Sequence, residues 1–405
     1  MSSPRPLACT PALFGPLTLR NRVIKTATYE GMTPGGRVSP QLIAYHGELA
    51  RRGVALTTVA YGAVSADGRT FGEQLLIDEA NLSGLAALTE AVHRAGGAAC
   101  LQLAHAGGFS KHRGISGRAP RGPSLGLNAY GLAHGLPLIR KMSDDDLART
   151  LDAYGYAAAL ARRAGFDALE LHCGHGYLLS QFLSPRDNRR RDRYGGSRWR
   201  RLRFPLAVAR RVRAVAGSEL ALAAKINLAD GVRRGLGLDE AKAVARALTE
   251  VGVDAIIPSG GMVQRSAFYL LRGDVPLRAM ARVERDSLQR WALRLFGPLF
   301  VRPWRYGSGF FFDEAASLLD SLRAAGHEVP VALLGGVDSA SLIDRALARG
   351  FGFVALGRAL LADPDLVERL CAGEDVVSRC DHCNQCVATM DEGGVRCTLD
   401  ERGEA

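Results

Sequence analysis

Short apolar runs alternate along the chain with longer segments in which apolar residues recur at helical spacing. The short runs are continuous rather than alternating, which is typical of parallel strands buried on both faces. They predict strands at residues 22–26, 54–60, 98–103, 168–171, 220–226, 254–257, 331–334 and 353–356. The helical patterns predict helices at residues 40–52, 82–95, 144–164, 199–216, 238–251, 313–325, 339–349 and 361–370.

Eight strands that are each followed by a helix predict an α/β fold of the (β/α)8 barrel type, with loop insertions. We expect residues 1–373 to form this barrel, with residues 262–310 as an insertion that serves as a lid or an oligomer contact. Residues 374–405 are predicted to be a short Cys-rich C-terminal segment packed on the barrel. Further long loops, at residues 107–142 and 172–197, leave the C-terminal ends of strands, where barrels of this type carry their sites.

Composition narrows the class of protein. Of 405 residues, 47% are hydrophobic and 23% are charged, which excludes a mainly disordered chain. No apolar stretch reaches the ~18 residues of a membrane span, and the start lacks the apolar core of a signal peptide, so we expect a cytoplasmic protein with no membrane partner. The net charge of +11 fits either an anionic partner or an arginine-rich surface. No basic stretch is interleaved with aromatics, so no nucleic-acid partner is expected.

Glycines end the last two predicted strands. Gly335-Gly336 follows the seventh strand and Gly357-Arg358 follows the eighth. Loops at these two positions of a barrel commonly bind phosphate through backbone N–H groups, and Arg358 could pair with the phosphate directly. A tight turn is the alternative for either glycine pair.

Polar rings gather after the fourth strand. His172, His175 and Tyr177 leave it together, and such a group could hold a carbonyl oxygen and deliver a proton. Gln102 ends the third strand, and its carboxamide suits the amide-like edge of a ring. Lys225 lies in the apolar fifth strand, where it needs either an electron-rich ligand or an ion pair within the barrel.

Four cysteines crowd the C-terminal segment as Cys380-x2-Cys383-x2-Cys386-x10-Cys397. Thiolates at this spacing indicate an iron–sulfur cluster or a zinc site, and three tightly spaced thiolates with a distant fourth favour iron–sulfur. Four unligated thiols are the alternative. The other cysteines (Cys9, Cys100, Cys173 and Cys371) are scattered, and eight in total are too few for a disulfide scaffold.

Several of these motifs occur in an order that resembles the Old Yellow Enzyme family of FMN-dependent oxidoreductases, within the NADH:flavin oxidoreductase group. They are Phe14-Gly15-Pro16-Leu17, the strand 100–103 with its Gln102, the sequence LHCGHGYLLSQFLSP at residues 171–185, the Ser259-Gly260-Gly261 turn and the two glycine loops. The resemblance implies a (β/α)8 barrel with FMN at its mouth, NAD(P)H as electron donor and a small unsaturated substrate.

The resemblance also implies roles for single residues. Thr26, Ala27 and Ala60 would lie along the flavin, Gln102 and Lys225 would bind its ring, and Gly335, Gly336, Gly357 and Arg358 would hold its phosphate. His172 and His175 would bind the carbonyl oxygen of an activated alkene, and Tyr177 would donate the proton. Tyr29 departs from the family, because many members have a small Cys or Thr there beside the flavin.

The cysteine quartet is similar to that of larger iron–sulfur flavoproteins, the dienoyl-CoA reductases and trimethylamine dehydrogenases. This implies a 4Fe-4S cluster at Cys380, Cys383, Cys386 and Cys397, with zinc as the alternative. An alternative function is then a flavin and iron–sulfur dehydrogenase for an amine or an enoyl thioester. Because the chain ends at Ala405, such a cluster would pass electrons to a separate redox partner.

We also expect the protein to form a homo-oligomer.

Overall fold

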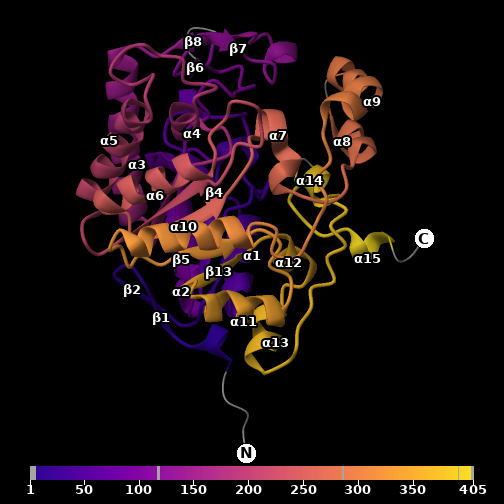
Figure 1. Ribbon diagram of the computed structural model, residues 1–405. Helices are drawn as coiled ribbons and strands as arrows, with labels where there is room; N and C mark the ends of the chain where they lie inside the picture. Colours follow the sequence, from indigo (N-terminus) through magenta and orange to yellow (C-terminus); the bar gives the residue numbers. More distant parts are fainter. Residues whose placement is uncertain (1–5, 116–118, 285–286, 391, 403–405) are drawn as a thin grey trace, which may run out of the picture.

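The computed structural model describes residues 6–115, 119–284, 287–390 and 392–402. Eight parallel strands form one sheet in the order β11-β10-β9-β5-β4-β3-β13-β12. A backbone bridge between Ile256 and Val331 joins the two outer strands, with the Ile256 N–H donating to Pro330 O at 3.0 Å, so the sheet curls into the predicted (β/α)8 barrel (Figure 1). The strands are β3 (Val23–Lys25), β4 (Leu56–Ala63), β5 (Ala98–Ala104), β9 (Ala168–Cys173), β10 (Ala221–Asn227), β11 (Ala255–Ser259), β12 (Ala332–Leu334) and β13 (Phe353–Leu356).

Helices cover the outside of the barrel, and their caps follow from the sequence. Ser143 accepts from the N–H of Asp146, whose carboxylate accepts from the N–H of Ser143, and this capping box starts the longest helix. The helices that follow strands are α1 (Pro40–Arg51), α2 (Leu82–Arg94), α3 (Asp144–Arg163), α4 (Leu178–Leu183), α5 (Arg198–Ala216), α6 (Leu238–Glu250), α10 (Phe312–Ala324), α11 (Ala340–Arg349), α12 (Arg358–Ala362) and α13 (Leu366–Cys371).

The single helix predicted at residues 361–370 is wrong in one respect. The structure has two helices there, α12 and α13, separated at Asp363 and Pro364. Proline disfavours helical backbone in the residue before it, and Asp363 adopts φ −131° and ψ 79°. The break ends α12 one turn after Arg358, directly beside the predicted phosphate loop.

Additional elements close the barrel bottom and extend its mouth. A hairpin of β1 (Ala12–Phe14) and β2 (Leu17–Leu19) places Phe14 against Phe353, with ring centroids 5.3 Å apart. The long loop after β5 forms a small sheet of β6 (Arg121–Gly122), β7 (Gly126–Leu127) and β8 (Leu138–Lys141). The insertion after β11 holds α7 (Val263–Leu270), α8 (Leu277–Val283) and α9 (Ser287–Phe300), apart from residues 285–286, which lie outside the described residues.

The C-terminal segment carries α14 (Cys386–Thr389) and α15 (Leu399–Arg402), and α14 packs next to α8 on one side of the barrel (Figure 1). It bonds to the barrel at several points, including the Val395 N–H to Glu30 O at 2.6 Å. Two of the scattered cysteines, Cys9 and Cys371, form a disulfide that joins the N-terminal segment to α13. No helix among the described residues is long and apolar enough to span a membrane.

Candidate active site and cofactor pocket

One cavity at the mouth of the barrel gathers most of the predicted cofactor residues. Its lining includes Thr26, Ala27, Lys225, Gly335, Gly336, Gly357 and Arg358. These residues come from the C-terminal ends of β3, β10, β12 and β13, or from the loops that follow them. His175 lines the same cavity, whereas Ala60 on β4 and Gln102 on β5 are buried and do not line it. The structure therefore brings seven of the nine predicted flavin and phosphate residues to one cavity.

The glycines after β12 make a backbone surface that other residues could not form. Gly335 has φ +105°, and a Cβ there would lie 2.5 Å from a Phe311 ring carbon. Gly336 has φ +76°, and its Cβ would lie 2.8 Å from the Gly307 carbonyl oxygen. Both conformations favour glycine, and because neither residue has a side chain, the backbone of this loop itself lines the cavity. The arrangement suits an anionic group such as phosphate.

A buried polar network lies on the neighbouring strands. Lys225 Nζ donates to Thr26 Oγ1 at 2.9 Å and lies 3.0 Å from the Glu170 carboxylate. Gln102 Nε2 donates to the same Glu170 oxygen at 2.5 Å. All of these side chains are buried. Lys225 therefore makes the internal ion pair that the sequence left open as an alternative, and it also faces the cavity.

His172, His175 and Tyr177 form one aromatic cluster. The rings of His172 and Tyr177 stack with centroids 4.4 Å apart, and the His172 and His175 rings meet edge to face at 5.0 Å. Both the backbone and the ring of His175 are held in place. The backbone N–H donates to Asn227 Oδ1 at 3.0 Å, and the ring Nε2 lies 2.7 Å from Ser259 Oγ. His172 Nδ1 is buried without a hydrogen-bond partner among the described residues. His172 reaches the cavity only through His175, which lines it, and an unpaired buried nitrogen at such a place is typical of a site that a ligand completes.

Burial fixes the protonation states of this cluster. Burial lowers the pKa of His175 to about 3, and the charge of Lys225 acts in the same direction. The pKa of His172 falls well below its usual range for the same reason, with His175 adding to the effect. Burial raises the pKa of Tyr177 well above its usual value, and the Tyr61 phenol adds to this rise. Near neutral pH the site holds two neutral imidazoles and one protonated phenol.

Two residues of the site, Tyr61 and Glu170, had no clear signal in the sequence, whereas Tyr29 and the turn at Ser259 did. Tyr61 packs on Tyr177 with ring centroids 5.0 Å apart, and Tyr29 packs on Tyr61 at 5.7 Å. Ser259 and Glu170 complete the two polar groups described above. Glu170 could have been found, because it lies two residues before His172 on β9 and so faces the same side of the strand.

The cysteine quartet is not arranged as a metal site. Among the described residues, no group of three or more His, Cys, Asp or Glu side chains is placed to hold a metal ion. Cys380 Sγ lies 3.5 Å from His382 Nδ1, and Arg402 donates to Cys383 Sγ at 3.2 Å, so two thiols have other partners. The four thiols are still neighbours. Burial raises the pKa of Cys386 to about 12, and the other three thiols contribute in the same direction.

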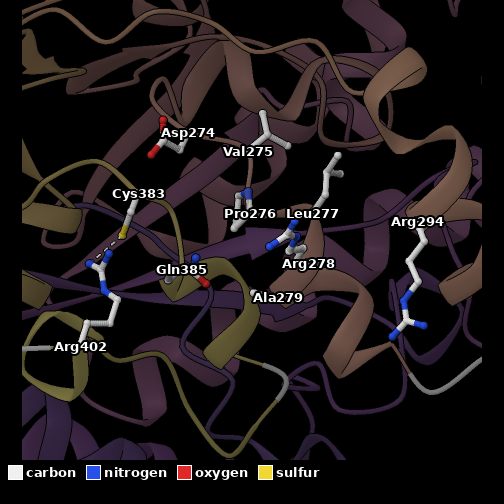
Figure 2. Close-up of a pocket in the computed structure, with 10 residues that line it drawn as sticks. All are labelled: Asp274, Val275, Pro276, Leu277, Arg278, Ala279, Arg294, Cys383, Gln385 and Arg402. Atoms are coloured by element: carbon white, nitrogen blue, oxygen red, sulfur yellow. Dashed lines mark hydrogen bonds between the residues drawn. The ribbon is translucent and has the colours of Figure 1, made fainter. Parts of the chain in front are cut away.

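A second pocket lies beside the quartet. Figure 2 shows it between the start of α8 and the C-terminal segment, with Arg402 directed at Cys383 and with Arg278 and Arg294 further along. Cys383 and Asp274 face this pocket, whereas Cys380, His382 and Leu271 face the cofactor cavity. The two hollows are thus separated by the turn at residues 380–384 and the segment at residues 271–274.

Comparison with known proteins places the chain. A model of the "NADH:flavin oxidoreductase / NADH oxidase family" matches residues 9–266. The chain belongs to this family. It is 41% identical over 402 residues to the 4,4'-dithiodibutanoate disulfide reductase of Rhodococcus erythropolis, covering 98% of this chain and 96% of that protein. It is 29% identical to an NADH oxidase of Thermoanaerobacter brockii over 92% of this chain, but spans only 52% of that protein.

Solved structures agree on the fold. A 2-naphthoyl-CoA reductase complex matches with a TM-score of 0.80 at 22% identity, over 98% of this chain and 57% of that one. A morphinone reductase in complex with tetrahydroNAD matches with a TM-score of 0.69 at 25% identity, over 92% of both chains. An old yellow enzyme homologue from Zymomonas mobilis matches at 0.68. The Old Yellow Enzyme resemblance and the barrel are confirmed, and the protein is an NAD(P)H-dependent flavin oxidoreductase with FMN as cofactor.

Proposed function

We propose that this protein reduces an activated C=C bond with electrons from NAD(P)H. The observation that supports this most is the cluster of His172, His175 and Tyr177, where two neutral imidazoles lie beside a protonated phenol. Neutral imidazoles can donate hydrogen bonds to a carbonyl oxygen as it gains negative charge, and a protonated phenol can donate a proton.

The cavity residues bind the cofactor in this proposal. Gly335, Gly336 and Gly357 offer backbone groups to the phosphate, and Arg358 offers its guanidinium. Gln102 and Lys225 contact the flavin ring, with Thr26, Ala27 and Ala60 along it. When bound and reduced, FMN supplies a hydride to the β-carbon of the alkene.

The protein side chains carry the rest of the reaction. His172 and His175 hold the substrate's carbonyl oxygen, and they stabilise the negative charge that develops there as the β-carbon accepts hydride. Tyr177 gives its proton to the α-carbon and regains one from solvent. The balance is one NAD(P)H and one proton consumed for each C=C bond reduced. Burial keeps the Tyr177 phenol protonated by raising its pKa, and the Tyr61 phenol packed against it adds to this effect.

A second candidate is reduction of an organic disulfide. The support is the 41% identity to a 4,4'-dithiodibutanoate disulfide reductase over almost the full length of both chains. In this reaction the S–S bond breaks, NAD(P)H supplies two electrons, and a proton joins each sulfur to give two thiols. Tyr177 can supply one of these protons from its present position.

The remaining predictions concern the metal at the C-terminal segment, the partners and location of the protein, and its domain division. A 4Fe-4S cluster at the quartet, with zinc as the alternative, stays a prediction. The proposed reaction does not use it, because the thiols are not arranged as ligands among the described residues. A redox partner depends on that cluster. Homo-oligomer formation, a cytoplasmic location and the barrel and C-terminal divisions at residues 1–373 and 374–405 also stay predictions. Iron and acid-labile sulfide assays on anaerobically purified protein test the cluster.

One experiment with two alternative electron acceptors separates the two functions. Reduced holoenzyme is mixed anaerobically with 2-cyclohexenone or with 4,4'-dithiodibutanoate, and flavin reoxidation is followed at about 450 nm while products are quantified. Our first proposal predicts rapid reoxidation by the enone with one cyclohexanone per flavin. Rapid reoxidation by the disulfide alone, with two thiols per flavin, would overturn it in favour of the second.

A further inference from the structure

Arg358 lines the cofactor cavity, and its hydrogen bonds to other described residues all come from one guanidinium nitrogen. Its Nη1 donates to Leu271 O at 3.3 Å, to Arg272 O at 3.0 Å and to Asn384 Oδ1 at 2.6 Å. Its Nε and Nη2 make no hydrogen bond to another described residue, and the side chain lines the cavity beside Gly357. Because a guanidinium is planar and rigid, anchoring Nη1 fixes the direction of the remaining N–H groups.

The three anchors of Arg358 are all neutral oxygens. Two are backbone carbonyls at the end of α7, and the third is the Asn384 carboxamide. Arg358 is half-buried, and no carboxylate among the described residues forms a salt bridge with it. The positive charge is therefore held in place without being neutralised, which is what recognition of a phosphate requires.

Asn384 is built to serve as this anchor. It is 1% exposed, and its Nδ2 donates to Leu271 O at 2.5 Å and to Asp274 O at 2.8 Å. These two bonds fix which end of the amide faces Arg358, because the donor end is already used. Its backbone has φ +56°, a conformation that Asn and Gly adopt more readily than other residues. Asn384 lies between Cys383 and Cys386, so it belongs to the turn that separates the two pockets.

We infer that Asn384 is a positioning residue for the FMN phosphate, acting through Arg358. The inference rests on the proposed assignment of Arg358 to the phosphate. It gives the Cys-rich segment a role that does not depend on a metal: the turn at residues 380–384 forms the back wall of the phosphate site. It also predicts that a change in this turn alters the recognition of FMN but not of riboflavin, which lacks the phosphate.

The test compares FMN with riboflavin on the full-length chain. Flavin is removed and restored, and dissociation constants are measured by quenching of flavin fluorescence. The variants are Asn384→Gly, which tolerates the positive φ, Arg358→Gln and the double variant. The control is Gln385→Ala, the next residue, whose side chain makes no hydrogen bond to another described residue. Circular dichroism establishes that each variant is folded.

We expect Asn384→Gly to weaken FMN binding about tenfold or more while riboflavin binding changes little, as for loss of a hydrogen bond to a charged group. Arg358→Gln should show the same selectivity, and the double variant should be no worse than Arg358→Gln alone. Gln385→Ala should bind both flavins normally. If Asn384→Gly fails to fold, Asn384→Asp takes its place, because its carboxylate would neutralise Arg358 and also reduce the preference for FMN.

The two assignments fail in different ways. If Arg358→Gln leaves the FMN preference unchanged, Arg358 does not bind the phosphate. If Arg358→Gln reduces the preference but Asn384→Gly or Asn384→Asp does not, Arg358 binds the phosphate without help from Asn384, and the inference is overturned. Equal weakening of FMN and riboflavin in the Asn384 variant would show a structural role only, and would also overturn it.

Discussion

Glu170 and Lys225 lie on the adjacent strands β9 and β10, and the Glu170 carboxylate is 3.0 Å from Lys225 Nζ inside the barrel. The same carboxylate oxygen accepts from Gln102 Nε2. One buried carboxylate thus orients both side chains that the proposal assigns to the flavin ring. It also offsets the charge of Lys225, which would otherwise act on the flavin in full.

Glu170→Gln should raise the reduction potential of bound flavin. Without the carboxylate, the Lys225 charge favours the anionic reduced form by about 1–3 kcal/mol more, or about 20–65 mV for a two-electron couple. Spectroelectrochemical titration of the holoprotein measures the potential. The control is Glu90→Gln, which removes an exposed ion pair with Arg94. An unchanged or lower potential in Glu170→Gln would show that this carboxylate does not tune the flavin.

Gly335→Ala should remove FMN from the purified protein. The added Cβ would meet the Phe311 ring at 2.5 Å, in a loop that must also keep its positive φ. Gly326→Ala is a matched control, because Gly326 also has a positive φ (+79°) but open space around it. Both variants carry the backbone cost of about 1–2 kcal/mol, so a difference in FMN content isolates the loss of space. Equal FMN content in the two variants would show that the close packing around Gly335 is not needed to bind FMN.

Acid should destabilise the fold through His175. The unfolded chain binds a proton at this residue near pH 6.5, whereas burial beside Lys225 lowers the pKa in the folded protein to about 3. Between these values the unfolded state binds more protons, so the free energy of unfolding falls as the pH decreases from about 6.5 towards 3. Urea titrations from pH 7 to pH 4 should show a shallower dependence in His175→Gln. The same slope in both proteins would mean that His175 is not held neutral.

The Cys9–Cys371 disulfide should stabilise the oxidised protein. It closes a loop across a sequence separation of 362 residues, and native disulfides typically contribute about 2–4 kcal/mol. Reductant should therefore lower the free energy of unfolding of the natural protein but not of Cys9→Ser or Cys371→Ser. If both variants are as stable as the natural protein without reductant, the pair is not joined in solution.

The barrel could be predicted because its signals are local. Most strands are short, mainly apolar runs, such as Phe353–Leu356, and the long helices have their own apolar spacing, several with a serine cap. The strands β6, β7 and β8 gave no such signal, because they are two to four residues long and partly exposed. The break at Pro364 was missed because the apolar spacing continues across it.

The site was predictable in its residue types but not in its pairings. His172, His175 and Tyr177 lie within six positions of one another, so their proximity follows from the chain itself. The partner of Lys225 depends on the register between β9 and β10, which no single-strand pattern reveals. The disulfide joins positions 362 residues apart, and the hydrogen bond from Arg358 to Asn384 joins positions 26 residues apart, so neither follows from a local pattern. The metal ligands stay a prediction that rests on cysteine spacing and on a family resemblance, and neither fixes where each thiol points.

The most direct test of the proposed reaction is the Tyr177→Phe variant, followed in separate half-reactions. Phe keeps the ring that stacks on His172 and removes only the phenolic hydroxyl group, which carries the proton. Flavin reduction by NAD(P)H should remain near the natural rate, whereas anaerobic reoxidation by 2-cyclohexenone should slow by about 10²–10⁴-fold, the usual range for loss of a general acid. Reoxidation by the enone at the natural rate in Tyr177→Phe would contradict the assignment of Tyr177 as the proton donor.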